Sequence, residues 1–155
     1  MTHERPLESC FFQIVNDFFG PLPIHSDLHQ CHYSQVCYAQ NPYGSEGFFP
    51  VSENYHENGI LKKSTAPTSL DSNIDIDIKT KAKKLAQNLN LYGVLAIELF
   101  ELLDGSIVFN EIAPRPHNSF HWTLDGCNIS QFDILVRTIC GLPVKDVECN
   151  GKWEM

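Results

Sequence analysis

The amino-acid sequence predicts an α+β fold in which an antiparallel β-sheet is backed by two helices. Three observations predict this class. Asp104-Gly105 lies between two apolar runs and marks a β-hairpin, while residues 74–90 and 129–140 each carry apolar side chains at helical spacing. The chain has 155 residues, of which 43% are hydrophobic, so it is long enough and apolar enough to bury a core.

Extended segments and turns alternate in the first half of the chain. Turn-forming residues such as Asn, Pro and Gly separate short runs that favour the extended conformation. The predicted strands are residues 35–40, 47–53 and 60–64, with turns at 41–44 and 56–59. Residues 10–19 are rich in aromatic side chains and fit either a short helix or a strand.

The two predicted helices have recognisable ends. A stretch rich in capping residues, Ser69–Asn73, precedes the first helix. Its start is uncertain by one turn, because isoleucines alternate over residues 74–78 as they would in a strand. The second helix is capped by Asn128 or Ser130 and is stopped by Gly141 and a proline beyond it.

The hairpin is expected to pair Val94–Leu102 with Ser106–Ala113 around Asp104-Gly105. Asp-Gly between apolar runs is a strong hairpin signal, because a type I′ turn needs positive φ at both central residues. A two-residue loop closed by Leu103 and Ser106 and a four-residue loop closed by Leu102 and Ile107 give the same register. The opposed pairs in that register are Leu102–Ile107, Phe100–Phe109 and Glu98–Glu111.

Glu98 and Glu111 are the leading candidates for a metal site. Directly opposed side chains lie roughly 4.5–5.5 Å apart, and like charges in that arrangement are destabilising. Their apolar neighbours, Phe100 and Phe109 among them, predict a buried face, where two ionised carboxylates must share a proton or a cation. Mg²⁺ suits the pair, because it takes a few carboxylates together with a substrate's phosphates. If the pair were exposed instead, salt would screen it and the repulsion would be mild.

The loop Pro114–Ser119 follows the second hairpin strand, so its side chains can share a pocket with the metal. Arg115 lies between two prolines that stiffen its backbone, and its planar fork of donors suits carboxylate, bicarbonate or phosphate. The alternative for Arg115 is a simple bridge to a surface carboxylate. His117 and Asn118 are further candidate donors, whereas Asn110 is expected on the other face of the sheet.

Composition argues against several classes of function. The formal net charge of −8 is unfavourable for a general binder of nucleic acid or of acidic membranes. No apolar run approaches the roughly 18 residues of a membrane span. The first residues lack a basic segment followed by an apolar one, so we expect a cytoplasmic protein whose six cysteines are free thiols.

The string NEIAPRPHNS at residues 110–119 resembles one particular ATP-grasp family. That family is the ATPase subunit of phosphoribosylaminoimidazole carboxylase, also called 5-(carboxyamino)imidazole ribonucleotide synthase. Further matching segments are Glu98-Leu99-Phe100, His121-Trp122-Thr123, Ser130-Gln131-Phe132, FPVSEN at 49–54 and ENGIL at 57–61. The resemblance covers roughly residues 34–148.

The resemblance implies both a domain organisation and a reaction. Residues 33–148 would be the carboxyl-side part of an ATP-grasp domain, between an unassigned segment (1–32) and a tail (149–155). The family uses ATP and bicarbonate to make carboxyphosphate, and then carboxylates 5-aminoimidazole ribonucleotide in purine biosynthesis. Glu98 and Glu111 match its magnesium ligands, which hold ATP through the metal. The residues that match its bicarbonate or carboxyphosphate site are Arg115, His117 and Asn118.

Three departures qualify what the resemblance implies. The family is more than twice as long, and residues 1–32 resemble neither its nucleotide-fold domain nor its phosphate-gripping lysines. The sequence also stops at Met155, before a trailing segment that helps to hold the ribonucleotide. Phe120 stands where the family has glycine, and a ring there is expected to obstruct close approach of the backbone to a ligand.

Two readings of function therefore stay open besides the ligase itself. In the first, the chain is an enzyme piece that forms a homodimer or associates with a chain supplying the missing half. In the second, it is a non-catalytic remnant or interaction module, whose exposed sheet edges favour association. A formate-dependent purine transformylase of the same superfamily is a further alternative.

Overall fold

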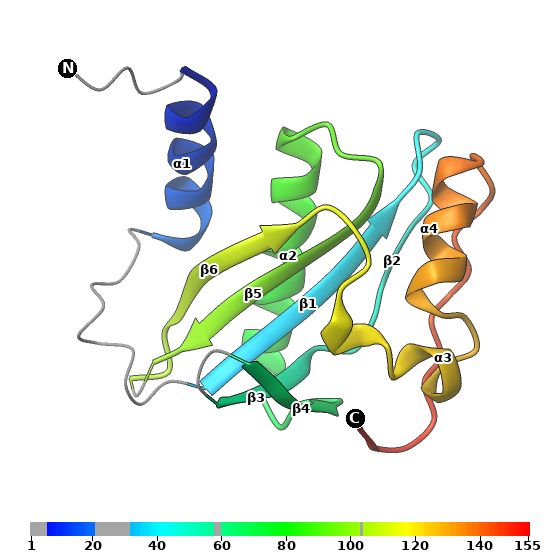
Figure 1. Ribbon diagram of the computed structural model, residues 1–155. Helices are drawn as coiled ribbons and strands as arrows, with labels where there is room; N and C mark the ends of the chain where they lie inside the picture. The colour runs from blue at the N-terminus through cyan, green and yellow to red at the C-terminus, as the bar shows by residue number, and fades with distance from the viewer. Residues whose placement is uncertain (1–5, 21–31, 58–59, 103) are drawn as a thin grey trace.

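The computed structural model describes residues 6–20, 32–57, 60–102 and 104–155, and its centre is a seven-stranded antiparallel sheet (Figure 1). The strands run in the order β6-β5-β1-β3-β4-β7, and β2 pairs with β1 beside this path. Their bounds are β1 His32–Gln40, β2 Glu46–Phe48, β3 Ser52–Glu57, β4 Ile60–Ala66, β5 Gly93–Glu101, β6 Ile107–Ala113 and β7 Trp153–Glu154. The predicted α+β class with an antiparallel sheet is confirmed.

Helices cover both faces of this sheet. The described residues form α1 Pro6–Phe19, α2 Ser72–Asn88, η2 Asn118–Phe120, α3 Thr123–Gly126 and α4 Gln131–Ile139. Helices α1 and α2 pack together on one face, and α4 packs against β1 and β5 on the other (Figure 1). Within the described ranges, none of these helices has both the length and the apolar character needed to cross a membrane.

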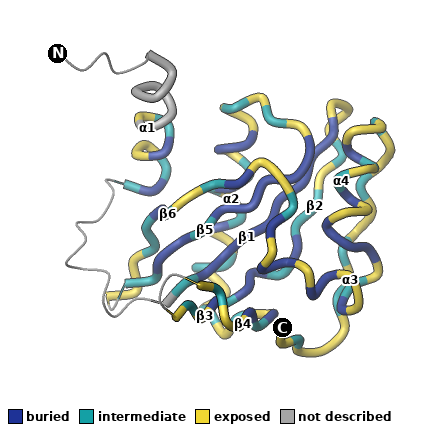
Figure 2. The backbone as a smooth tube through the Cα atoms, viewed as in Figure 1, coloured by how far each residue is buried: buried dark blue, intermediate teal, exposed yellow. Residues whose placement is uncertain are grey.

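The central strands are buried because they are covered on both sides (Figure 2). One set of side chains, including Val36, Ile97 and Leu99, packs against the helical pair α1 and α2. The alternate set, including Cys37 and Val94, packs beneath α4. Because successive side chains of a strand point to opposite faces of the sheet, β1 and β5 each contribute to both cores. Neither strand therefore has the polar face of a half-exposed strand.

The two helices expected from the sequence begin where side chains cap them. Asp71 accepts a hydrogen bond from the Asn73 backbone N–H at the start of α2, which satisfies one of the free donors of that terminus. Ser130 accepts from the Asp133 N–H at the start of α4, and the Asp133 carboxylate accepts from the Ser130 N–H in return. Ser130 is therefore the cap of α4, as one of the two alternatives predicted.

Other element boundaries differ from the sequence-based expectation. The strand predicted at residues 47–53 is divided into β2 and β3, which both pair with β1. Pro50 lies in the gap between them, and proline cannot donate a ladder hydrogen bond. Residues 10–19 fall within the helix α1, which resolves the helix-or-strand alternative left by their aromatic composition.

A β-bulge changes the register of the predicted hairpin. Glu98 does pair with Glu111, as expected, but the register shifts between Glu98 and Leu99, and Leu99 pairs with Phe109. The predicted pairs Phe100–Phe109 and Leu102–Ile107 are therefore wrong. Because the extra residue reverses the side-chain alternation, Phe109 faces the α1 side, where its ring lies 5.9 Å from that of Phe19.

The turn of the hairpin also differs from both closures considered above. The Leu102 N–H donates to the Ser106 carbonyl over 2.9 Å, and the Gly105 N–H donates to the Leu102 carbonyl over 2.9 Å. Gly105 has φ +81°, which only glycine adopts without steric cost. Closure by Leu102 and Ser106 moves the pairs next to the turn by one residue, and the bulge at Asn110 restores the expected pairing of Glu98 with Glu111. Leu103, on which the two-residue closure depends, lies outside the described residues.

A disulfide joins the end of the chain to the loop before α4. Cys127 and Cys149 are bonded, and the same two residues form an isolated antiparallel bridge. The expectation that all cysteines are free thiols is wrong for this pair, whereas Cys37 and Cys140 are free. Beyond the disulfide, β7 extends the sheet by pairing with β4, and the Trp153 side chain packs against the core beneath α4.

We predict that removing this disulfide destabilises the fold measurably. Replacing both Cys127 and Cys149 by serine releases a loop of 22 residues, and loss of such a link lowers the free energy of unfolding by about 2–4 kcal/mol. Urea unfolding followed by circular dichroism measures the change, with Cys140→Ser as the control because that thiol is exposed and free. An unchanged midpoint in the double variant would contradict a stabilising role for the link.

Candidate metal and anion site

A cleft of about 370 Å³ opens over β5 and β6 beside η2. It contains four of the five residues singled out from the sequence, namely Glu98, Glu111, His117 and Asn118. Its remaining lining residues are Tyr33, His56, Leu61, Phe100 and Asn110. Two carboxylates, two imidazoles and two amides thus share one concave surface with aromatic walls, which is the character of a binding site for a polar ligand.

The two glutamates reach the cleft from neighbouring strands. They are direct partners in the β5–β6 ladder, and both side chains face the cleft. The Glu98 side chain is 13% exposed, whereas Glu111 is exposed to solvent. Burial, followed by the nearby negative charge of Glu111, raises the pKa of Glu98 above that of an ordinary carboxyl group. The site therefore penalises two bare negative charges, and a bound cation relieves that penalty.

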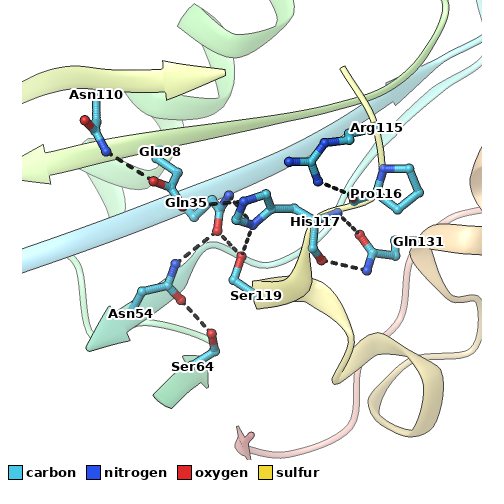
Figure 3. Close-up of polar contacts among 10 residues, drawn as sticks. All are labelled: Gln35, Asn54, Ser64, Glu98, Asn110, Arg115, Pro116, His117, Ser119 and Gln131. Carbon is cyan, nitrogen blue, oxygen red and sulfur yellow. Dashed lines mark hydrogen bonds and ion pairs between the residues drawn. The ribbon is translucent and has the colours of Figure 1, made fainter. Parts of the chain in front are cut away.

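Asn110 belongs to this site, contrary to the expectation that it faces away. The bulge turns its side chain toward the cleft, and Nδ2 donates to Oε2 of Glu98 over 3.1 Å (Figure 3). This hydrogen bond favours the ionised form of Glu98 and so partly opposes the effect of burial on its pKa. Alternation along a regular strand gives no signal for such a residue, because the bulge is set by pairing with β5.

His117 is held in place from both its backbone and its side chain. Its backbone N–H donates to Oε1 of Gln131, and its carbonyl accepts from Nε2 of the same side chain, both over 2.8 Å. Its ring nitrogen Nδ1 lies 3.0 Å from Nε2 of Gln35 and 2.9 Å from Oγ of Ser119. The other nitrogen, Nε2, lies 3.7 Å from Oε1 of Glu98.

Burial lowers the pKa of His117, and the positive charge of Arg115 lowers it further. The pKa of His56, on the opposite wall of the cleft, is also lowered by burial, against an opposing effect of Glu111. The lowered pKa of each imidazole favours its neutral form, and a neutral imidazole has one nitrogen free to accept a proton or to bind a metal.

A buried polar network lies beneath His117 and connects it to three strands. Ser119 donates its hydroxyl proton to Oε1 of Gln35, and Nδ2 of Asn54 donates to the same oxygen over 3.0 Å. Ser64 in turn donates to Oδ1 of Asn54 over 2.7 Å (Figure 3). Sequence reasoning missed these residues. These residues are polar but lie within strands that are otherwise apolar. That pattern indicates a buried hydrogen-bond network, because buried polar groups need partners.

Arg115 and Asn118 lie at the solvent side of the site. Arg115 is exposed, and its Nη1 donates to the Pro116 carbonyl over 3.1 Å, within its own loop (Figure 3). Asn118 begins η2 and lines the cleft, but its side chain is also exposed. The structure thus brings Glu98, Glu111 and His117 together in the cleft and leaves Arg115 beside it.

Phe120 does not enter the cleft. Its side chain is fully buried in the core beneath α4, where its ring packs 6.2 Å from Phe49 and 6.4 Å from Trp122 between centroids. The expected obstruction of the backbone by this ring is therefore wrong. The aromatic side chain fills the space between the η2 turn and the sheet, so its contribution is to packing.

Comparison with known proteins places this arrangement in a family. Residues 34–132 match the ATP-grasp domain, which is more than half of the chain and includes the glutamates, the loop and His117. The chain belongs to the ATP-grasp family. Its similarity to N5-carboxyaminoimidazole ribonucleotide synthase of Bacillus subtilis is 48% identity over 101 residues, which cover 65% of this chain and 27% of that protein.

Solved structures agree with this ATP-grasp assignment. An ADP complex of an N5-carboxyaminoimidazole ribonucleotide synthetase matches with a TM-score of 0.76 and 39% identity, over 79% of this chain and 33% of that one. The Aspergillus clavatus synthase in complex with ADP and 5-aminoimidazole ribonucleotide matches with a TM-score of 0.72 and 30% identity, over 79% and 34%. The chain spans about a quarter to a third of the length of these relatives.

We predict that Glu98→Gln stabilises the metal-free ATP-grasp chain at neutral pH. The amide keeps an oxygen for Asn110 and removes one of two opposed charges, so the free energy of unfolding rises by up to about 1 kcal/mol. The native pKa of Glu98 is raised, so its ionisation lowers stability as the pH rises above the ordinary carboxyl value of 4.5. In Glu98→Gln, the free energy of unfolding should no longer fall in this way as the pH rises. Urea unfolding from pH 4 to 8 tests it.

The control for that series is Glu101→Gln, at the end of the same strand but outside the cleft, which should leave the decline in place. A sharp loss of stability in Glu98→Gln would instead show that the ionised carboxylate holds the hairpin together.

We also predict that Phe120→Ala lowers the free energy of unfolding by about 3–5 kcal/mol, since it empties a fully buried site. Thermal and urea unfolding measure the loss, with Phe132→Ala as the control because that ring is 38% exposed. Equal effects of the two substitutions would contradict the packing role of Phe120.

Proposed function

We propose that this chain supplies the metal and anion sites of an ATP- and bicarbonate-dependent ligase. The ligase carboxylates 5-aminoimidazole ribonucleotide in de novo purine biosynthesis. The observation that carries the proposal is the opposition of Glu98 and Glu111 in a cleft that also holds His117 and Asn118. Similarity to the carboxyaminoimidazole ribonucleotide synthases supports the choice of substrate.

The donor set in the cleft suits a magnesium-bound nucleotide. Two carboxylates from adjacent strands offer hard oxygen ligands, and burial together with the negative charge of Glu111 raises the pKa of Glu98. Magnesium held there would neutralise charge on the ATP phosphates during phosphoryl transfer. The chain's own contribution is to hold Glu98 rigidly in a buried strand and to leave Glu111 free at the mouth of the cleft.

Arg115, His117 and Asn118 form the proposed anion side of the site. Arg115 stands at the solvent edge with one donor on the Pro116 carbonyl, which leaves the other guanidinium donors to bind bicarbonate or carboxyphosphate. The exposed Asn118 amide adds a donor on the same rim, and the neutral His117 ring accepts or passes a proton at Nε2. Fixed donors of this kind stabilise charge that develops on the transferred group.

The chain covers about a third of the length of solved relatives that are complexed with ADP, in one case together with 5-aminoimidazole ribonucleotide. We propose that the chain acts in association, with a second copy or with another chain. A cytoplasmic location fits the proposed pathway, and in that compartment the Cys127–Cys149 link is subject to reduction.

A chimera tests the proposed reaction. Residues 34–132 replace the matching segment of the Bacillus subtilis synthase, and ADP release is measured with 5-aminoimidazole ribonucleotide plus either bicarbonate or formate. We expect release that depends on both bicarbonate and the ribonucleotide. Dependence on formate would favour a transformylase instead. A folded chimera without activity under either condition would favour the non-catalytic module.

In the same chimera, Arg115→Lys should raise the KM for bicarbonate and lower kcat/KM by on the order of tenfold or more, because lysine cannot form the bidentate contact. Stability should change little, since Arg115 is exposed and, among the described residues, hydrogen-bonds only to Pro116 of its own loop. Lys84→Arg, an exposed basic residue on α2 outside the cleft, is the control. Unchanged kinetics in Arg115→Lys would rule out its role at the anion.

A further inference from the structure

The hydrogen bonds beneath His117 form a chain that runs in one direction. The Ser64 hydroxyl donates to Oδ1 of Asn54 over 2.7 Å, and Nδ2 of Asn54 donates to Oε1 of Gln35 over 3.0 Å (Figure 3). Gln35 then presents its amide nitrogen Nε2 to Nδ1 of His117 at 3.0 Å. The three donating side chains are buried, so their polar atoms depend on one another rather than on bulk water.

The direction of this chain determines what Gln35 offers to the imidazole ring. Its Oε1 accepts from Asn54 and from the Ser119 hydroxyl, so the amide nitrogen is the group that faces the ring. An amide nitrogen donates hydrogen bonds and does not accept them. Nδ1 of His117 is therefore the acceptor, and in a neutral imidazole the single proton is then on Nε2.

The carboxylate on the other side of the ring favours the same tautomer. Nε2 of His117 lies 3.7 Å from Oε1 of Glu98. A proton on Nε2 turns the positive end of an N–H dipole toward that oxygen, whereas an unprotonated Nε2 would turn its lone pair toward it. Ser119, whose oxygen is 2.9 Å from Nδ1, fits either tautomer because a hydroxyl both donates and accepts. Gln35 and Glu98 thus act in the same sense from opposite sides of the ring.

We propose that Gln35 is a positioning residue that keeps the proton of the neutral His117 ring on Nε2, so that His117 meets the anion in the cleft as a hydrogen-bond donor. Gln35 is fully buried beneath the ring, so it acts through His117 and does not touch the anion. This inference rests on the proposed function and narrows it. Of the two roles open to Nε2, accepting a proton or giving one, the network selects giving.

A donor at Nε2 suits the substrates of the proposed reaction. Bicarbonate and carboxyphosphate present oxygen atoms that accept hydrogen bonds. A donor that is fixed before the anion binds stabilises negative charge without reorganisation during the reaction. The opposite tautomer would place a lone pair against the anion. The network therefore explains why a polar side chain lies in the buried strand β1 at position 35, between the two cores.

The test of the tautomer uses the ¹⁵N-labelled 155-residue chain without metal, by nuclear magnetic resonance at a pH at which the ring is neutral. Ring ¹⁵N chemical shifts separate protonated from unprotonated nitrogens, and scalar coupling across a hydrogen bond connects a donor nitrogen to its acceptor nitrogen. We expect a protonated Nε2, an unprotonated Nδ1, and coupling between Nδ1 and the Gln35 side-chain amide. A proton on Nδ1 would mean that the amides are reversed, and it would overturn the inference while leaving the proposed reaction intact.

Gln35→Glu tests whether this residue controls the ring. The ionised carboxylate has the same shape but only accepts, so Nδ1 of His117 should become protonated and the coupling should disappear. Gln87→Glu, at an exposed position on α2, makes the same change of charge and should leave the ring unchanged. An unchanged ring in a folded Gln35→Glu chain would overturn the role of Gln35. Circular dichroism verifies folding, and the wild-type coupling alone remains decisive if Gln35→Glu does not fold.

The donor role is tested in the chimera with the Bacillus subtilis synthase, which contains residues 34–132. His117→Gln places an amide N–H near the position of Nε2, whereas the shorter side chain of His117→Asn does not reach it. The kcat/KM for bicarbonate should therefore be higher in His117→Gln than in His117→Asn by on the order of tenfold, as for a hydrogen bond to a charged group. Equal losses would indicate a base and overturn the donor role.

The two measurements separate this inference from the proposed function. An unmodified chimera that releases no ADP with bicarbonate would overturn the proposed reaction and, with it, the anion as the partner of Nε2. The resonance data on the 155-residue chain do not depend on activity, so they decide the control of the tautomer by Gln35 in either case.

Discussion

The opposition of Glu98 and Glu111 across the β5–β6 ladder is the constraint around which the site is built. Two carboxylates at adjacent ladder positions repel each other, and partial burial of one of them adds a desolvation cost. Such a pair lowers the stability of the isolated fold. A functional protein can keep such a pair when a cation or a positively charged ligand relieves the repulsion. The local destabilisation therefore points to a binding site.

The surrounding fold supplies the rigidity that this constraint requires. Strand β5 is central, is paired on both sides and has cores on both faces, so Glu98 cannot move away from its partner. Strand β6 is at the edge of the sheet and is held by the contact between Phe109 and Phe19 of α1. The bulge that buries Phe109 also brings Asn110 to Glu98. One inserted residue therefore serves both the core and the site.

Local sequence signals were sufficient for much of this architecture and insufficient for its details. The hairpin around Asp104-Gly105 was predictable from its turn residues. The pairing of Glu98 with Glu111 agrees with the prediction because the bulge offsets the one-residue difference in the turn closure. The bulge was not predictable, because local sequence does not show that Phe109 packs on the ring of Phe19 in a distant helix while Asn110 remains unpaired with β5. The disulfide between Cys127 and Cys149 was missed for a similar reason: spacing alone does not reveal which cysteines a fold brings together. The role of Gln35 likewise depends on a loop more than eighty residues away.

The network below His117 explains how the site is shaped before any ligand arrives. Gln131 from α4 fixes the backbone of His117, and Gln35 from β1 fixes its ring, so two elements on different sides of the loop determine one side chain. In the part of the chain that the structure describes, Arg115 has no such support and hydrogen-bonds only to Pro116 of its own loop. Preorganised groups suit tasks that demand fixed geometry, whereas an exposed guanidinium can follow an anion that changes shape. A single loop therefore carries both a fixed imidazole and an adaptable guanidinium, because only the first is held by side chains from α4 and β1.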